Sequence, residues 1–336
     1  YYMNQKIGTE SCYVCVSRPR RFGKSTDANM LVAYYSKGCD SHALFDGLKI
    51  GKTKGYVEHL NQHNVIYLNM QKFLSNSETI DGMIRLLTSE IIEDVNYELS
   101  IKDFSSPSLS LYLEKISQRM NLSFIFIIDE WDCIFREYKN KKEDQKLYLD
   151  FLRNLLKDQP YVELAYMTGI LPIKKYGTHS AINMFEEISM LNPEPYSCFM
   201  GFTEDEVKQL CKQFNVDFNV MQKWYDGYHL TNTISTFSPR SVVSALSRGR
   251  FDNYWTQTET YEALKIYIDM NYDGLKDAII QLLAGENVPI NPERFQNDMT
   301  TFASKDDVLT LMIHLGYLGY NQEESTCYIP NKEVRS

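Results

Sequence analysis

The sequence contains no apolar run that approaches the roughly 20 residues of a membrane-spanning helix. Residues 124–128 form the longest run of the kind found in protein cores, and it has the length of a strand. No positively charged segment followed by an apolar one opens the sequence, so these residues contain no secretory signal. We therefore expect a protein without a membrane partner.

An excess of positive charge is also lacking, because the 44 Asp and Glu residues outnumber the 35 Lys and Arg residues and the net charge is −9. The surface as a whole would not attract a phosphate backbone, so a nucleic-acid partner would need a local basic patch. Low-complexity tracts are missing as well, and 43% hydrophobic residues fit a folded protein. The seven cysteines are scattered, which predicts reduced thiols and a cytoplasmic location.

What the first half of the sequence does contain is an alternation of strand-like and helix-like segments. Strands are predicted for residues 13–16, 65–70, 124–128 and 163–168, and helices for residues 26–36, 79–97, 107–120 and 143–157. Ser106 would cap the third of these helices, with Pro107 as its first residue. This order predicts an α/β fold with a parallel sheet flanked by helices.

The alternation stops near Asn192-Pro-Glu-Pro195, where we place a domain boundary. Residues 1–195 would form the α/β domain. Residues 196–285 would form a mainly α domain, and a capping box at Thr203-Glu-Asp-Glu206 opens its first helix. Residues 286–336 end with a predicted helix, a glycine-containing turn and a pair of β-prone segments, and that order predicts a winged-helix-like end.

The loop Ser17-Arg-Pro-Arg-Arg-Phe-Gly-Lys-Ser25 separates the first predicted strand from the first predicted helix. Its last residues, Gly23, Lys24 and Ser25, match the end of a P-loop (Walker A). In such a loop backbone N–H groups surround phosphates, the lysine neutralises their charge and the hydroxyl binds Mg²⁺. Arg18 stands where the motif has its first glycine, so the loop by itself is a weak match.

A second feature strengthens the match, because the apolar strand at residues 124–128 is followed by Asp129 and Glu130. At the carboxyl edge of a parallel sheet Asp129 would hold Mg²⁺ and Glu130 would polarise the attacking water, as in a Walker B motif. The alternative is that both acids cap the next helix, with Asp132 doing the same. Thr168, at the end of another predicted strand, would place a hydroxyl near the γ-phosphate or serve as an ordinary turn residue.

The remaining candidates include arginines. Arg20 and Arg21 lie in the loop and would contact phosphate or a neighbouring subunit, unless they are merely solvated. Arg240 opens a predicted helix and would reach the nucleotide from the second domain, with a surface arginine as the alternative. The complete set expected to bind the nucleotide is Arg20, Arg21, Phe22, Gly23, Lys24, Ser25, Thr26 and Arg240.

These features belong to a set of ordered motifs that resembles the bacterial AAA-ATPase-like family. The set comprises the loop at residues 17–25, Ile127-Ile-Asp-Glu-Trp-Asp132, Met167-Thr-Gly-Ile-Leu171, Gly201-Phe-Thr-Glu-Asp-Glu-Val207, Trp224-Tyr-Asp-Gly-Tyr228, Tyr254-Trp255, Phe295-Gln-Asn-Asp298 and Ile329-Pro-Asn-Lys-Glu333. The resemblance implies a P-loop ATPase core that binds ATP and Mg²⁺, with the Thr168 strand between the Lys24 and Asp129 strands. It also implies that arginine at position 18 is usual in such loops.

Members of that family often begin a few residues earlier and continue into a nuclease-like domain of the PD-(D/E)XK type, so the resemblance implies a C-terminal effector beyond this sequence. Our leading hypothesis is an ATPase that acts as a switch: ATP closes the α/β domain on the helical domain, and hydrolysis reopens it. Turnover would be low or stimulated by a partner, and a homo-oligomer is one way to supply an arginine. The alternatives are a non-hydrolysing nucleotide-binding scaffold and a DNA-handling module.

Overall fold

The computed structural model describes residues 1–102, 104–173, 182–231, 234–255, 265, 268–269, 271–295, 302 and 304–336. The chain divides into two compact units. The first consists of Tyr1–Val16, Ser25–Gly169 and Lys175–Glu187, and the second of Ser17–Lys24, Ile170–Lys174 and Ile188–Ser336. The predicted phosphate-binding loop therefore belongs, up to Lys24, to the second unit.

The first unit is built around a five-stranded sheet with the strand order β2-β3-β4-β1-β5. Its strands are β1 (Tyr13–Ser17), β2 (Asn64–Asn69), β3 (Phe124–Asp129), β4 (Val162–Gly169) and β5 (Glu186–Ile188). Strand β3 pairs in parallel with both β2 and β4, and the register sets Asn69 opposite Asp129. The order places β4 between β1 and β3, as the family resemblance implied.

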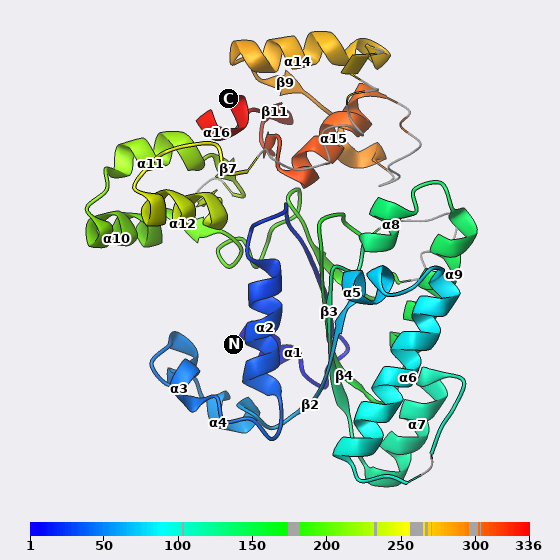
Figure 1. Cartoon of the computed structure of the whole chain (residues 1–336). Helices are drawn as coiled ribbons and strands as arrows, with labels where there is room; N and C mark the ends of the chain where they lie inside the picture. The colour runs from blue at the N-terminus through cyan, green and yellow to red at the C-terminus, as the bar shows by residue number, and fades with distance from the viewer. Residues whose placement is uncertain are drawn as a thin grey trace. The chain divides into compact units, whose positions relative to one another are not determined.

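Helices cover both faces of this sheet, with α2 on one side and α6, α7 and α9 on the other (Figure 1). The helices are α1 (Tyr2–Lys6), α2 (Lys24–Tyr35), α3 (His42–Phe45), the 3-10 helix η1 (Lys49–Lys52), α4 (Tyr56–His59), α5 (Met70–Ser75), α6 (Ile80–Glu98), α7 (Leu109–Met120), α8 (Cys133–Glu137) and α9 (Lys142–Leu156). Every residue of β3 is buried, as is typical of a parallel strand covered on both faces. The predicted α/β fold with a parallel sheet flanked by helices is confirmed.

The predicted start of α7 is wrong. This helix begins at Leu109 rather than at Pro107, because the hydroxyl of Ser108 accepts a hydrogen bond from the Leu111 amide and caps the helix. The hydroxyl of Ser106 accepts from the Ser108 amide instead, within the turn that precedes the helix. Both serines are suitable capping residues, and Ser108 is the one that bonds to a backbone amide of the helix.

The second unit contains helices and two three-stranded sheets, with the strand orders β6-β8-β7 and β10-β11-β9. Its described elements are β6 (Phe202–Thr203), α10 (Glu204–Phe214), α11 (Phe218–Tyr225), β7 (Tyr228–His229), β8 (Ser235–Phe237), α12 (Pro239–Arg248), η2 (Tyr272–Gly274), α14 (Leu275–Ala284), β9 (Val288–Pro289), η3 (Pro292–Arg294), α15 (Lys305–Leu315), β10 (Gly319–Asn321), β11 (Thr326–Tyr328) and α16 (Lys332–Arg335).

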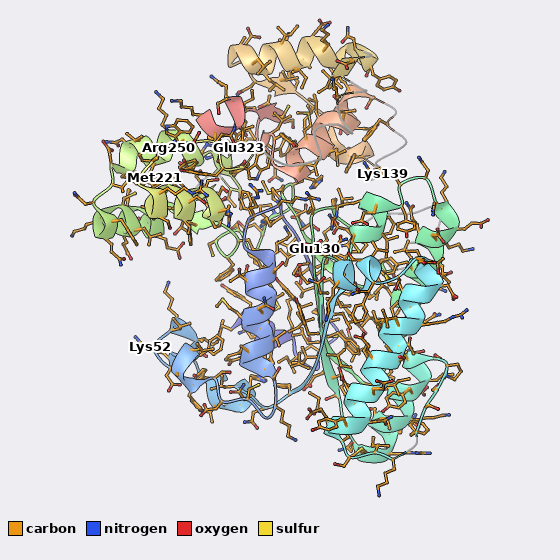
Figure 2. The ribbon with its side chains drawn as sticks, in the orientation of Figure 1. Lys52, Glu130, Lys139, Met221, Arg250 and Glu323 are labelled. Atoms are coloured by element: carbon orange, nitrogen blue, oxygen red, sulfur yellow. The ribbon has the colours of Figure 1, made fainter. Side chains whose placement is uncertain are left out.

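A compact apolar core joins α10, α11 and α12 in this unit. It consists of Val207, Cys211, Met221, Tyr225, Phe237, Val242 and Ala245. Met221 lies on α11 (Figure 2) and is fully buried. The predicted capping box at the start of α10 is confirmed, because the Thr203 hydroxyl accepts from the Glu206 amide and the Glu206 carboxylate accepts from the Thr203 amide.

The last part of the second unit runs from α15 into the antiparallel strands β10 and β11, with Gly319 opposite Tyr328. The predicted order of a helix and a β-pair is therefore confirmed, whereas the winged-helix assignment stays a prediction. Residues 296–298 of the Phe295 motif lie outside the described residues. Within the part of the chain that the structure describes, no helix is both long and apolar enough to span a membrane.

Candidate functional site

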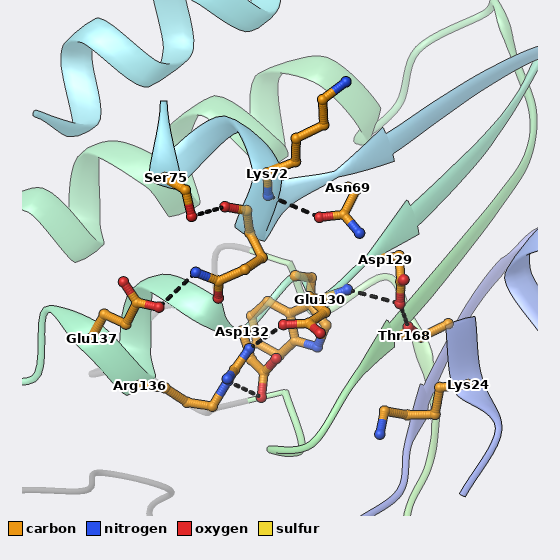
Figure 3. A network of polar contacts seen from close by, with 12 residues as sticks. Lys24, Asn69, Lys72, Ser75, Asp129, Glu130, Asp132, Arg136, Glu137 and Thr168 are labelled. Atoms are coloured by element: carbon orange, nitrogen blue, oxygen red, sulfur yellow. Dashed lines mark hydrogen bonds and ion pairs between the residues drawn. The ribbon is translucent and has the colours of Figure 1, made fainter. Parts of the chain in front are cut away.

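Two strand ends of the first unit form one polar cluster at the carboxyl edge of the sheet (Figure 3). Asp129, the last residue of β3, is fully buried. Its Oδ1 atom accepts a hydrogen bond from the Glu130 amide at 3.1 Å and another from the hydroxyl of Thr168. Thr168 is fully buried near the end of β4. The structure thus brings Asp129, Glu130 and Thr168 together.

The second carboxylate oxygen of Asp129, Oδ2, is buried and has no hydrogen-bond partner among the residues that the structure describes. A buried charged oxygen costs free energy unless a cation or a donor satisfies it. Mg²⁺ is a hard cation that takes carboxylate and hydroxyl oxygens as ligands. The Asp129 carboxylate at the end of β3 is therefore chemically suited to contact a hard cation.

Glu130 follows β3 in a left-handed backbone conformation, with φ of 55°. Residues other than glycine rarely adopt this conformation, and where they do they often lie at functional sites. The Glu130 side chain is 36% exposed, and its Oε2 atom accepts a hydrogen bond from Arg136 Nη2 at 2.7 Å. The carboxylate is therefore within reach of solvent, while an ion pair determines where it lies.

Arg136, on α8, joins two carboxylates of this cluster. Besides its bond to Glu130, its Nε atom lies 3.5 Å from Oδ2 of Asp132, which is fully buried. Burial by itself lowers the pKa of Arg136, but the charges of Asp132 and Glu130 outweigh burial and raise it overall. Asp132 occupies the N-cap position of α8 without a capping hydrogen bond from its side chain, so the helix-cap interpretation of Asp132 is wrong.

Replacing Arg136 by alanine is expected to lower the free energy of unfolding by about 3 kcal/mol, because it removes the positive charge beside the buried Asp132 carboxylate. Chemical denaturation measures this change. Arg85→Ala is the matched control, since Arg85 pairs with Asp81 at the surface with 79% of its side chain exposed, and it should change stability little. Equal, small effects of the two variants would contradict a structural role for Arg136.

The end of the predicted phosphate-binding loop differs from expectation in one respect. Helix α2 begins at Lys24 rather than Thr26, so Lys24, Ser25 and Thr26 lie in its first turn. Gly23 precedes it with φ of 93°, a conformation that favours glycine. Lys24 is buried and its Nζ atom donates a hydrogen bond to the carbonyl oxygen of Pro19 at 2.8 Å, whereas Ser25 and Thr26 are exposed.

Arg18 occupies the position of the missing glycine without strain. The left-handed residues of this loop are Arg21 and Gly23, and Arg18 is not one of them, so its position does not require glycine. The Arg18 side chain is fully buried and donates a hydrogen bond from Nη1 to the Ser17 carbonyl at 3.2 Å. Burial, together with the positive charge of Arg18, lowers the pKa of the His314 imidazole to about 3.

Two other predicted residues of the loop contact residues that lie far along the sequence in the same unit. Arg21 is not merely solvated, because its Nη1 atom donates hydrogen bonds to the carbonyl oxygens of Tyr254 and Trp255. The ring of Phe22 is 1% exposed and packs edge to face against Tyr228, with ring centroids 5.1 Å apart. The Phe22 side chain is therefore part of the packing, and only the backbone of this residue is left to contact a ligand.

The roles predicted for the other two arginines, Arg20 and Arg240, stay predictions. The carbonyl oxygen of Arg20 accepts a hydrogen bond from Trp255 Nε1 at 3.3 Å, and its side chain is half-buried. Arg240 is exposed near the start of α12, which begins at Pro239. Neither observation assigns a ligand to these side chains.

Sequence reasoning missed two residues of the polar cluster. Arg136 follows Asp132 by four positions, and that helical spacing of opposite charges was a usable signal. Asn69 ends β2 opposite Asp129, and its side chain caps α5 by accepting a hydrogen bond from the Lys72 amide at 2.9 Å. An asparagine at the end of a predicted strand resembles any turn residue, so only the register of the sheet distinguishes it.

A family model described as predicted AAA-ATPase, AAA-ATPase-like, matches residues 2–178. Among solved structures the chain is similar to a Walker-type ATPase of Pyrococcus abyssi, with 12% sequence identity and a TM-score of 0.47, over 96% of this chain and 89% of the other. No curated protein matches the sequence.

Proposed function

Because the chain belongs to the AAA-ATPase-like family of predicted AAA-ATPases, we propose that it binds ATP together with Mg²⁺ and hydrolyses the nucleotide. The observation that carries this proposal is Asp129, a fully buried carboxylate at the carboxyl end of a parallel strand. Its Oδ2 atom has no hydrogen-bond partner within the described residues, as expected of a ligand for a cation. Ligands of open α/β sheets bind at this edge of the sheet.

Phosphate binding is assigned to the loop and to the beginning of α2. A helix of 12 residues presents free backbone N–H groups and the positive end of its dipole at its N-terminus, and both favour an anion. The Lys24 ammonium group would exchange its hydrogen bond with the Pro19 carbonyl for one with a phosphate oxygen. The remaining contacts would come from the backbone of Arg20, Arg21, Phe22 and Gly23 and from Thr26.

Hydrolysis is assigned to the residues around the end of β3. The Ser25 hydroxyl and Asp129 would hold Mg²⁺, which when bound neutralises charge on the phosphates. Glu130 would accept a hydrogen bond from a water molecule and take its proton as the water oxygen attacks the γ-phosphorus and the bond to the ADP oxygen breaks. Thr168 would keep Asp129 in place through its hydrogen bond to Oδ1.

A regulatory role is the finer part of the proposal. The nucleotide state would control an effector, and the nuclease-like domain implied by the family resemblance is our candidate. Arg240, exposed on α12, would contact the nucleotide of its own chain or of a second copy. ATP shifts such a switch only if it binds one conformation more tightly than the other.

A non-hydrolysing nucleotide-binding scaffold is the second candidate, and one observation favours it. The carboxylate proposed as the general base is already bonded to Arg136 at 2.7 Å. An ion pair of this kind restrains the carboxylate and occupies the oxygen that bonds to Arg136. Such a protein would bind ATP and Mg²⁺ without turning the nucleotide over.

Phosphate release from ATP, measured with the purified chain, separates the two candidates. An ATPase releases phosphate in the presence of Mg²⁺ and stops when EDTA removes the metal. A scaffold binds a fluorescent ATP analogue but releases no phosphate, either alone or with duplex DNA as a stimulating partner. Failure to bind the analogue at all would contradict both.

A further inference from the structure

The phosphate-binding loop is held from outside by residues that lie far along the sequence, all within the second unit. Trp255 donates a hydrogen bond from Nε1 to the Arg20 carbonyl, and Tyr228 donates one from its hydroxyl to the Gly316 carbonyl at 2.8 Å. A Cβ atom at Gly316 would lie 2.7 Å from Cβ of Pro19, so this backbone approaches the loop closely. These contacts restrict where the loop lies.

Arg21 lies in this loop in a left-handed backbone conformation. Its φ of 69° is unfavourable for a residue with a side chain, so the surroundings must stabilise it. The guanidinium group supplies that stabilisation by donating to the carbonyl oxygens of Tyr254 and Trp255. The conformation of the loop therefore depends on the position of these two carbonyl groups.

Glu333, on α16, holds the segment that carries them. Its Oε1 atom accepts hydrogen bonds from the Tyr254 amide at 2.7 Å and from the Ser241 hydroxyl at 2.9 Å. Its backbone carbonyl accepts a further hydrogen bond from Asn253 Nδ2 at 3.1 Å. The segment formed by residues 253–255 is thus attached to Glu333 on one side and to Arg21 on the other.

The Glu333 carboxyl group is buried. The residue is 1% exposed, and burial raises the pKa of its carboxyl group to about 7, against the opposing effects of its hydrogen bonds and of the Arg21 charge. Burying an acid is unfavourable compared with burying an apolar residue of similar size. An apolar residue at this position would not accept the hydrogen bonds that Glu333 accepts from Ser241 and Tyr254.

We propose that Glu333 is a positioning residue for the nucleotide site, because it fixes the segment at residues 253–255 whose carbonyl groups hold Arg21 and, through Arg21, the phosphate-binding loop. The inference rests on the proposed binding of ATP by that loop. It assigns to α16 an influence on nucleotide affinity that acts through the segment at residues 253–255 and Arg21.

Titration of the full chain with a fluorescent ATP analogue and Mg²⁺ tests the inference. Glu333→Ala is expected to raise the Kd on the order of tenfold, since the Tyr254 amide loses its hydrogen bond to the buried Glu333 side chain. Glu333→Gln keeps an acceptor for the Tyr254 amide and should stay within about twofold of the unchanged protein. In an ATPase assay the alanine variant should raise KM and leave kcat unchanged, because the lost interaction concerns binding only.

A double-mutant cycle distinguishes a relay through Arg21 from a general loss of stability. In the Arg21→Ala background, Glu333→Ala should weaken binding no further, because the two residues act in one chain of contacts. Glu323→Ala, a change of an exposed acid in the same unit, is the matched control with unchanged Kd. Circular dichroism shows whether Glu333→Ala folds. If it does not, Asn253→Ala should raise the Kd instead, because it removes the hydrogen bond from Asn253 Nδ2 to the Glu333 carbonyl oxygen.

Three results would overturn the inference. They are an unchanged Kd in folded Glu333→Ala, an unchanged Kd in Asn253→Ala, and effects of Arg21→Ala and Glu333→Ala that simply multiply. Lack of binding by the unchanged protein is a different outcome, because it would contradict the proposed function and the inference together.

Discussion

The Glu130→Gln variant is expected to bind ATP as tightly as the unchanged protein and to release phosphate roughly 10²- to 10⁴-fold more slowly. Glutamine matches glutamate in size and still offers an acceptor to Arg136, so the left-handed turn at this position should persist. A neutral amide does not take a proton from the attacking water, and the reaction loses its general base. Titration with a fluorescent ATP analogue gives the Kd, and phosphate release at saturating ATP gives the turnover.

Glu137→Gln provides a matched control for this result. Glu137 is an exposed acid of α8 and accepts a hydrogen bond from Gln71 Nε2 at 2.6 Å, close to the polar cluster (Figure 3). Its amide variant should hydrolyse ATP at the normal rate. Normal turnover in Glu130→Gln would remove the role assigned to that residue, and an equal loss in both variants would indicate damage to α8 rather than a missing base.

The Lys24→Ala variant is expected to lose nucleotide binding, with a Kd raised on the order of a hundredfold or more. Lys24 is 8% exposed, so its ammonium group would meet a phosphate oxygen where water competes little for the hydrogen bond. Alanine removes the charge and leaves the negative phosphates without their principal partner. The measurement is again a titration with the fluorescent analogue, accompanied by thermal unfolding to verify that the variant folds.

A second lysine change controls for the loss of one positive charge. Lys52 is exposed on η1, and Lys52→Ala should bind the analogue normally (Figure 2). Tight binding by a folded Lys24→Ala protein would show that the nucleotide binds elsewhere or that the loop binds through its backbone alone. In either case the assignment of the ammonium group to the phosphates would be wrong.

The strands of the first unit were largely predictable, and the reason is local. Residues 124–128 are all apolar because a strand between two neighbours in a covered parallel sheet buries both of its faces. The acid that follows marks the edge of the sheet, and Asp129 lies there as the last residue of β3. The composition of a short run of residues carries this information, so it can be found in the sequence alone.

The ends of helices were less predictable, because several polar residues near a helix start can serve as its cap. Ser106 and Ser108 are equally suitable by residue type, and the hydrogen bond to the Leu111 amide selects Ser108. The start of α2 at Lys24 follows from the left-handed conformation of Gly23, which propensity alone does not reveal. The first residue of a helix thus depends on backbone angles and hydrogen bonds that residue type alone does not determine.

The sequence by itself determined the chemistry of the candidate site: a Gly-Lys-Ser end to a loop, and an acid pair at the end of a buried strand. Tertiary structure decided how the loop is held. Arg21 bonds to the Tyr254 carbonyl 233 positions away, and Phe22 packs against Tyr228. Residue type and spacing reflect constraints within one or two elements, whereas contacts at this separation exist only once the whole unit has packed.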